Sequence, residues 1–164
     1  MKVLIACVGN IFLGDDGFGV EVARSLSQRQ LPEGVSVKDY GIRGFDLAYA
    51  LLDPWDLVII VDALSRGEVA GTLYVIEPEL HGPASADTAL NPHGMDPVRV
   101  LSLAASMGTI SAQVLVVGCE PHDFGDELEG RMGLSSPIQC VVEAAGDMIL
   151  DLVANAVRFQ TVER

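Results

Sequence analysis

The fold is decided by the stretch Val3-Leu4-Ile5-Ala6-Cys7-Val8-Gly9-Asn10-Ile11-Phe12-Leu13-Gly14-Asp15-Asp16-Gly17-Phe18-Gly19. Its first six residues are all apolar, which is typical of a short strand buried on both faces of a parallel sheet. A glycine-rich turn follows, and a helical pattern begins near its end. Proteins of the α/β class usually bind a ligand at such a strand–turn–helix junction.

The turn contains two adjacent carboxylates, Asp15 and Asp16. A glycine-rich turn normally binds phosphate through backbone N–H groups at the partly positive start of the helix. Carboxylates at this place would repel a pyrophosphate and attract a cation or a hydrogen-bond donor. We therefore expect a metal or polar-substrate site and no nucleotide. Asp15 is predicted to cap the helix, which leaves Asp16 for function.

The composition is that of one globular domain over residues 1–164, with 49% hydrophobic residues. A formal net charge of −13 argues against nucleic acid and anionic membranes as partners. The apolar run before the first turn is too short for a signal peptide, and none approaches the roughly 20 residues of a membrane span. We expect a cytoplasmic protein. Cys7, Cys119 and Cys140 are predicted to be small core residues.

Five strands are expected, over residues 2–8, 35–39, 56–63, 72–77 and 112–118. The connection between the third and fourth strands is too short for a parallel crossover, which needs about a dozen residues or more. The strand over 72–77 should therefore run against the rest, and it would form a hairpin with the third strand if the two were neighbours. The predicted fold is a three-layer α/β/α sandwich around a twisted mixed five-stranded sheet with one antiparallel strand.

Helices are expected over residues 16–30, 45–52 and 137–159, and after Asp96-Pro97, where Asp96 is the N-cap. Val98, Leu101 and Ala105 are predicted to form the buried stripe of that third helix. The final helix has an apolar face and carboxylates at intervals of four, so it should pack against the core. Residues 78–92 and 120–136 are expected to be long loops.

Asp16, Asp62 and His93 are the candidate site residues because strands or long loops should bring them to one edge of the sheet. Two carboxylates and an imidazole suit a borderline divalent metal with open coordination positions. Each residue also has a structural interpretation: Asp16 as a helix cap, Asp62 as a cap of the turn toward Ser65, and His93 as an ordinary loop residue. His81 and His122 are expected to be solvated.

The motifs resemble those of the hydrogenase maturation endopeptidases. They comprise Gly9-Asn10 with Leu13, Asp15-Asp16-Gly17 and Gly19, then Asp39-Tyr40-Gly41-Ile42-Arg43-Gly44, Ile60-Val61-Asp62-Ala63, Pro92-His93 and Gly118-Cys119-Glu120-Pro121. The resemblance implies an aspartic-type endopeptidase that removes a C-terminal extension from the precursor of a [NiFe]-hydrogenase large subunit.

By position, the family's metal-binding residues fall on Asp16, Asp62 and His93. Nickel is expected to belong to the substrate, where it signals that the precursor is ready. Asp16 and Asp39 are the candidate catalytic bases, and Gly41 and Gly44 are expected to bind substrate. The second turn departs from the common Asp-Gly-Gly-Thr-x-Gly pattern, because it lacks the threonine and contains Arg43. Two other functions stay open: a non-catalytic nickel-binding assembly factor, and a nucleoside- or phosphate-handling hydrolase, against which the acidic turn argues.

Overall fold

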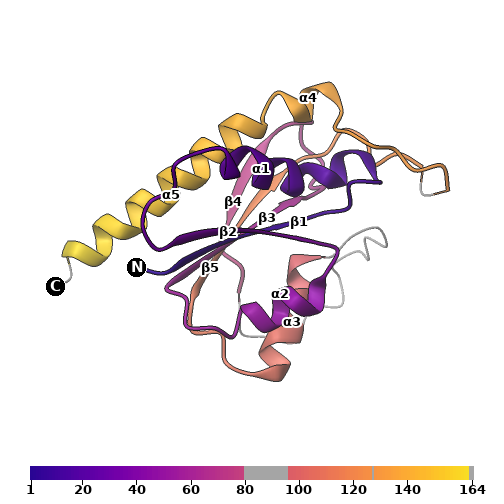
Figure 1. The fold of residues 1–164 in the computed structure, drawn as a ribbon. Coiled ribbons are helices and arrows are strands. Elements are labelled where there is room, and N and C mark those ends of the chain that lie inside the picture. The colour runs from indigo at the N-terminus through magenta and orange to yellow at the C-terminus, as the bar shows by residue number, and fades with distance from the viewer. Residues whose placement is uncertain (80–95, 127, 163–164) are drawn as a thin grey trace.

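The computed structural model describes residues 1–79, 96–126 and 128–162, which form an open sheet with helices on both faces (Figure 1). In chain order the elements are β1 (Val3–Val8), the 3₁₀ helix η1 (Gly14–Gly17), α1 (Phe18–Ser27), β2 (Val35–Gly41), α2 (Gly44–Ala50), β3 (Leu57–Ala63), β4 (Leu73–Ile76), α3 (Pro97–Met107), β5 (Gln113–Cys119), α4 (Ser136–Gln139) and α5 (Val142–Val162).

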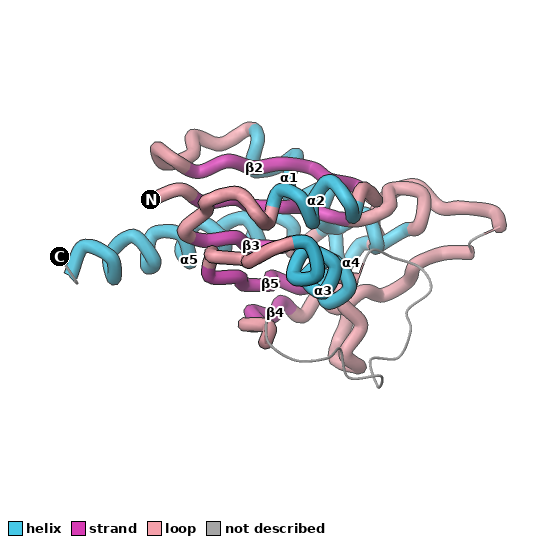
Figure 2. The backbone as a smooth tube through the Cα atoms, turned by 90° about the horizontal axis from the view of Figure 1, so that it is seen from below, coloured by secondary structure: helices cyan, strands magenta, loops and turns pink. Residues whose placement is uncertain are grey.

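The five strands are ordered β2-β1-β3-β5-β4 (Figure 2). The four strands β2, β1, β3 and β5 are mutually parallel, and β4 pairs antiparallel with β5. The mixed sheet with one antiparallel strand is therefore confirmed. β3 and β4 are not neighbours, so no hairpin joins them. Their connection instead passes the end of β5, where Leu64 N–H donates to the Cys119 carbonyl and Gly71 N–H donates to the Glu120 carbonyl.

The sheet has a hydrophobic core on each face. α1 and α5 cover one face and α2 and α3 the other, which gives the predicted three layers (Figure 1). β1 supplies both cores, because successive side chains of a strand point to opposite faces. Val3, Ile5 and Cys7 belong to the core under α1 and α5, and Leu4, Ala6 and Val8 to the other.

The helices α1 and α3 each differ from expectation in one detail. The first helix begins later, because Gly14–Gly17 forms a separate 3₁₀ turn. Asp96 does cap α3, accepting the Val98 N–H at 2.9 Å, but the buried stripe is Val100, Leu101 and Ala104, while Val98 and Ala105 are exposed. α3 is rich in small apolar residues on two neighbouring faces. The apolar pattern of the sequence therefore does not show which of the two faces is buried.

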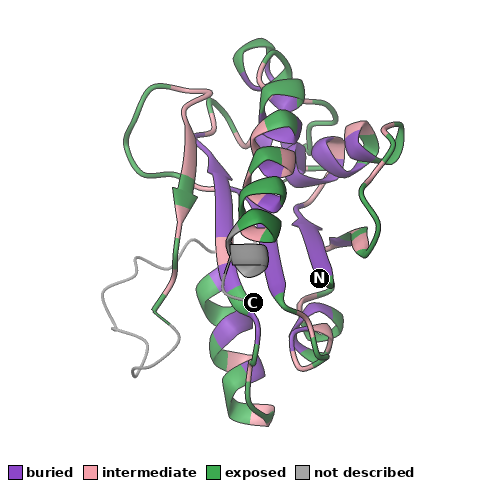
Figure 3. Cartoon of the chain, turned by 90° about the vertical axis from the view of Figure 1, so that its left-hand side faces the viewer, coloured by how far each residue is buried: buried purple, intermediate pink, exposed green. Residues whose placement is uncertain are grey.

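The expected final helix is divided into α4 and α5. The chain tightens between them, since Val141 N–H donates to the Ile138 carbonyl, three residues back instead of four. The buried side of α5 faces the sheet and its carboxylates face outward, as predicted (Figure 3). No helix in the described part of the chain is long and apolar enough to cross a membrane.

The strand order places a topological switch point between β1 and β3. The crossover from β1 to β2 contains α1, on one face, whereas the crossover from β2 to β3 contains α2, on the other face. In open α/β sheets the crevice at the carboxyl ends of such strands is where ligands bind. The first turn follows β1 at this place, and Asp62 lies near the end of β3.

Candidate active site

Two glycines let the first turn fold back over the strand ends. Gly9 has φ +143°, and a Cβ on it would collide with the backbone carbonyl of Asp16. A Cβ on Gly19 would collide with the carbonyl oxygen of Val8 and lie 2.6 Å from that of Val61. Only hydrogen fits at these positions. The glycines therefore bring Asp16 to the carboxyl ends of β1 and β3.

Asp16 is almost completely buried, with 6% of its surface exposed. One of its carboxylate oxygens accepts a hydrogen bond from the Asn10 N–H at 2.8 Å. The backbone N–H of Asp16 in turn donates to the Leu13 carbonyl at 3.0 Å. Hydrogen bonds within the first turn thus hold this carboxylate in place.

Asp62 is likewise buried and lies near the end of β3, opposite Gly118 of β5. One of its oxygens accepts the N–H of the next residue, Ala63, at 2.8 Å. Burial, followed by the negative charge of Asp16, raises the pKa of Asp62 well above its ordinary value, and Asp96 contributes further. Asp16 and Asp62 are therefore electrostatically coupled, and a cation between them would relieve their repulsion.

His93, the third expected ligand, lies outside the described residues, as does His81. Within the ranges that the structure describes, no three His, Cys, Asp or Glu residues are grouped so as to hold a metal ion. The structure thus brings Asp16 and Asp62 to one edge of the sheet. A metal site shared with His93 stays a prediction.

Asp15 is not a helix cap, which corrects the expectation. The residue before α1 is Gly17, and no side chain caps that helix. The Asp15 side chain is fully buried and accepts hydrogen bonds from the backbone N–H groups of His122, Asp123 and Ser135 and from the Ser135 hydroxyl. Burial alone would raise its pKa, but these bonds outweigh burial and lower it. Asp15 fixes the 120–136 loop to the first turn.

Glu120 has a second anchoring role that the sequence did not reveal. It is 4% exposed and accepts hydrogen bonds from the N–H groups of Arg66 and Gly67 and from the Tyr74 hydroxyl. Burial opposes ionisation, yet the bonds from Tyr74 and from the backbone lower the pKa of Glu120. Its position directly after the buried strand β5 was the available signal, since an unpaired charge there would be unfavourable.

The second glycine-rich turn lies beside the first. Gly9 N–H donates to the Gly41 carbonyl at 3.0 Å, and Gly41 has φ +53°. Asp39 is exposed, and one of its oxygens accepts the Gly41 N–H at 2.7 Å. The Arg43 guanidinium donates to the carbonyls of Asp39 and Tyr40. Arg43 therefore stabilises the turn that contains Asp39, Gly41 and Gly44.

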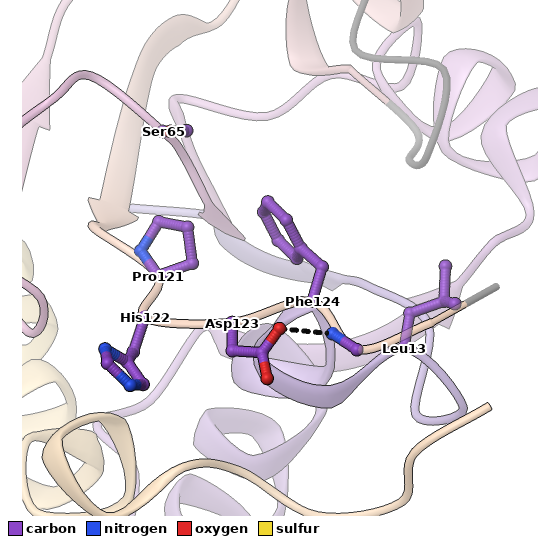
Figure 4. A pocket seen from close by; sticks show the side chains of 7 residues that line it. Leu13, Ser65, Pro121, His122, Asp123 and Phe124 are labelled. Carbon is purple, nitrogen blue, oxygen red and sulfur yellow. Dashed lines mark hydrogen bonds between the residues drawn. The ribbon is translucent and has the colours of Figure 1, made fainter. Parts of the chain in front are cut away.

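A pocket of about 400 Å³ opens next to the first turn (Figure 4). It is lined by Leu13, Ser65, Pro121, His122, Asp123, Phe124 and Gly125. His122 is exposed as expected and contributes to this lining. The walls come from the loops after β1, β3 and β5, so the pocket lies at the same edge of the sheet as Asp16 and Asp62.

Neither buried cysteine has the environment of an activated nucleophile. Cys7 and Cys119 are buried, as expected, whereas Cys140 is exposed. Burial, and secondarily Asp39, raises the pKa of Cys7, while burial and the charges of Asp15 and Glu120 raise the pKa of Cys119 to about 12. Both buried thiols are therefore protonated near neutral pH.

Known proteins share both the sequence and the fold. The family model described as hydrogenase maturation protease matches residues 20–152. The hydrogenase 2 maturation protease of Escherichia coli K12 is 31% identical over 92% of this chain and 89% of its own length. A putative hydrogenase maturation protease of Methanocaldococcus jannaschii is 31% identical over 90% of this chain and 94% of its own length.

Solved structures share the fold of this chain. An endopeptidase from Escherichia coli, determined in solution, superposes with a TM-score of 0.79 at 27% identity, over 95% of this chain and 94% of that one. The hydrogenase maturating endopeptidase HybD of the same organism gives a TM-score of 0.76 at 26% identity, with the same coverage. The chain therefore belongs to the hydrogenase maturation protease family, whose members are hydrolases of peptide bonds.

Proposed function

We propose that this protein is an endopeptidase that removes the C-terminal extension of a nickel-loaded [NiFe]-hydrogenase large-subunit precursor in the cytoplasm. Nickel belongs to the substrate and serves as the recognition element. The observation that supports this proposal most directly is the pair of buried carboxylates, Asp16 in the turn that follows β1 and Asp62 near the end of the neighbouring strand β3. A cation at this ligand-binding edge would offset the burial and repulsion that raise the pKa of Asp62, and would stabilise both carboxylates in their charged form.

The donor set suits a metal that remains with the substrate. Asp16 and Asp62 supply oxygen ligands, and the family resemblance assigns the imidazole of His93 as the third ligand. Such a site binds nickel less tightly than thiolates do, because soft sulfur ligands form the stronger bonds. The protein could therefore contact nickel held by cysteines of the precursor without extracting it, and a precursor lacking nickel would bind less well.

The reaction adds water across one peptide bond. Water attacks the carbonyl carbon, the carbon–nitrogen bond breaks, and the departing nitrogen takes up a proton. The metal of the substrate would orient the C-terminal segment and polarise the scissile carbonyl or the water. A carboxylate must accept the proton of water, and Asp16 and Asp39 are the two candidates. The Gly9–Gly41 hydrogen bond joins the turns on which they lie.

Gly41 and Gly44 line the second turn without side chains, and we assign them to contacts with the substrate backbone. Gly41 has φ +53°, a conformation that favours glycine, and a Cβ there would meet no atom closer than 3.9 Å. The turn is therefore open on this side. An extended peptide can approach its backbone closely.

Incubation of the purified protein with the precursor, with and without nickel, tests the proposal. We expect specific cleavage of the nickel-loaded form and little of the nickel-free form. Equal cleavage of both would overturn nickel recognition. Tight binding of the loaded precursor without cleavage would identify the alternative, a non-catalytic nickel-binding assembly factor.

A further inference from the structure

The pocket beside the first turn has no part in the chemistry described so far. Its volume of about 400 Å³ is near the lower end for ligand sites, so it has room for one or two side chains but not for a folded segment. None of its lining residues is Asp16, Asp39 or Asp62. A separate binding function therefore needs to be considered for it.

The wall nearest to Ser65 is apolar. The rings of Pro121 and Phe124 extend from the same side of their loop toward Ser65, and Leu13 lines the pocket beyond Phe124 (Figure 4). Asp123 is directed elsewhere, because its two oxygens accept hydrogen bonds from the Gly125 N–H and the Arg131 guanidinium. The Asp123 carboxylate is thus already paired, and Ser65 and His122 are the other polar side chains of the lining. An apolar group is the ligand that such walls exclude from water most favourably.

Two buried carboxylates hold the walls in position. Asp15 binds the N–H groups of His122 and Asp123, and Glu120 binds those of Arg66 and Gly67, next to Ser65. Neither carboxylate is a lining residue, but Glu120 also accepts a hydrogen bond from the hydroxyl of the lining residue Ser65, at 3.4 Å, so both are positioning residues. A binding pocket gains affinity when its walls are ordered before the ligand arrives.

The pocket is joined to the candidate active site by short pieces of chain. Leu13 accepts a hydrogen bond from the Asp16 N–H, and Ser65 lies three residues after Asp62. Three residues of chain span at most about 10 Å. An extended peptide advances about 3.3 Å per residue, so a peptide held at both carboxylates would reach the pocket within about three residues.

We propose that this pocket is a substrate subsite that binds an apolar side chain of the precursor within about three residues of the scissile bond. The proposal rests on the proposed endopeptidase function. It adds a recognition element that is independent of nickel. The enzyme would then test both the metal and the sequence next to the cleavage point.

The substitution Ser65→Trp should block the pocket. The control is Ser102→Trp, which makes the same change at an exposed position of α3. Ser65 is exposed. The change removes only the long hydrogen bond of 3.4 Å from its hydroxyl to Glu120, and the N–H groups of Arg66 and Gly67 can still bind that carboxylate, so the variant should fold. With nickel-loaded precursor we expect Ser65→Trp to raise KM about tenfold or more. kcat at saturation should change little, and Ser102→Trp should match the unmodified enzyme.

A second set of assays identifies the occupant. Each apolar residue within three positions of the cleavage point in the precursor is changed to aspartate, one at a time. One such change should raise KM for the unmodified enzyme but have little further effect on Ser65→Trp. Phe124→Leu, which shortens one wall, should shift the preference toward larger apolar residues, a gain that misfolding cannot produce.

The outcomes separate this proposal from the proposed function. If the unmodified enzyme cleaves the precursor and Ser65→Trp has the same KM, the subsite is overturned. The endopeptidase assignment then remains intact. If no nickel-loaded precursor is cleaved, the proposed function fails. The affinity of each variant for the precursor then tests whether the subsite exists. Weaker binding to Ser65→Trp than to Ser102→Trp would then support it, and equal or absent binding would overturn it.

Discussion

The buried carboxylate of Asp15 accepts two hydrogen bonds from Ser135, one from its backbone N–H at 2.6 Å and one from its hydroxyl at 2.8 Å. The two residues are 120 positions apart in the sequence. The first turn and the segment before α4 are therefore joined through one ionised group. His122 and Asp123 bind the same carboxylate, so Asp15 connects three parts of the chain at the edge of the sheet.

Asp15→Asn should destabilise the protein by about 2–3 kcal/mol, because the amide NH₂ would face N–H groups that need an acceptor. A helix cap would have tolerated the same change, since asparagine caps helices about as well as aspartate. Chemical denaturation followed by circular dichroism measures the loss. Ser135→Ala is the control, because it removes only the hydroxyl, and we expect a loss of about 1 kcal/mol.

Stability should fall in acid as Asp15 and Glu120 become protonated. Both pKa values are lower in the folded protein than the ordinary values of 3.8 and 4.5. The stabilisation is therefore complete above these ordinary values and is lost as the pH falls from them through the lower folded values. Free energies of unfolding measured between pH 7 and pH 3 test this. Asp15→Asn should show a weaker dependence, and an identical slope would contradict the assignment.

Glu120→Gln should destabilise the loop after β3 and weaken the proposed subsite. Glutamine keeps one acceptor oxygen but presents an NH₂ group to Arg66, Gly67 or Tyr74, which donate to the carboxylate. We expect a loss of about 1–3 kcal/mol and a higher KM for the precursor. Tyr74→Phe removes one donor and should have the smaller effect. An unchanged KM would show that Glu120 does not position the pocket.

Asp16→Asn should abolish processing while the fold is retained. The change keeps the size of the side chain and an acceptor for the Asn10 N–H, but it removes the charge that binds a cation. His93→Ala should have a similar effect, because both residues are assigned to the same metal. Cleavage of nickel-loaded precursor is measured with circular dichroism as the folding control, and Asp53→Asn serves as the exposed match. Near-normal cleavage by both variants would refute metal recognition.

Asp39→Asn distinguishes the two candidate bases. Asparagine can still accept the Gly41 N–H, so the turn should keep its shape, and an exposed residue contributes little to stability. We expect kcat to fall about 100-fold or more with little change in KM, as for the loss of a general base. An unchanged kcat would leave Asp16 as the proton acceptor.

Much of the fold could be predicted because its signals are local. Uninterrupted apolar runs identify strands buried on both faces, and the short connection after β3 predicted an antiparallel strand. The partner of β4 could not be predicted, because loop length limits direction but does not say that β5 lies between β3 and β4. Val98 was assigned to the wrong side of α3, since several small apolar residues there satisfy more than one helical face.

The placement of two candidate residues could be predicted, because it depends on where the strands end. Asp16 and Asp62 could be placed at one edge because parallel strands end together. Asp15 could not be understood in this way, because its partners lie 107 to 120 residues away and only the folded chain brings them close. Glu120 and Pro121 lie in a recognised motif, but the motif does not predict their contacts, because the N–H groups that bind Glu120 come from Arg66 and Gly67, more than 50 residues earlier.

The unequal surroundings of the three cysteines make the unmodified chain suitable for site-specific labelling. A maleimide reacts with an accessible thiolate, and the buried Cys7 and Cys119 have raised pKa values. The exposed Cys140 should therefore be the one position that takes up a dye. It follows α4, five residues after Ser135, so the fluorophore would report on the loop that Asp15 holds.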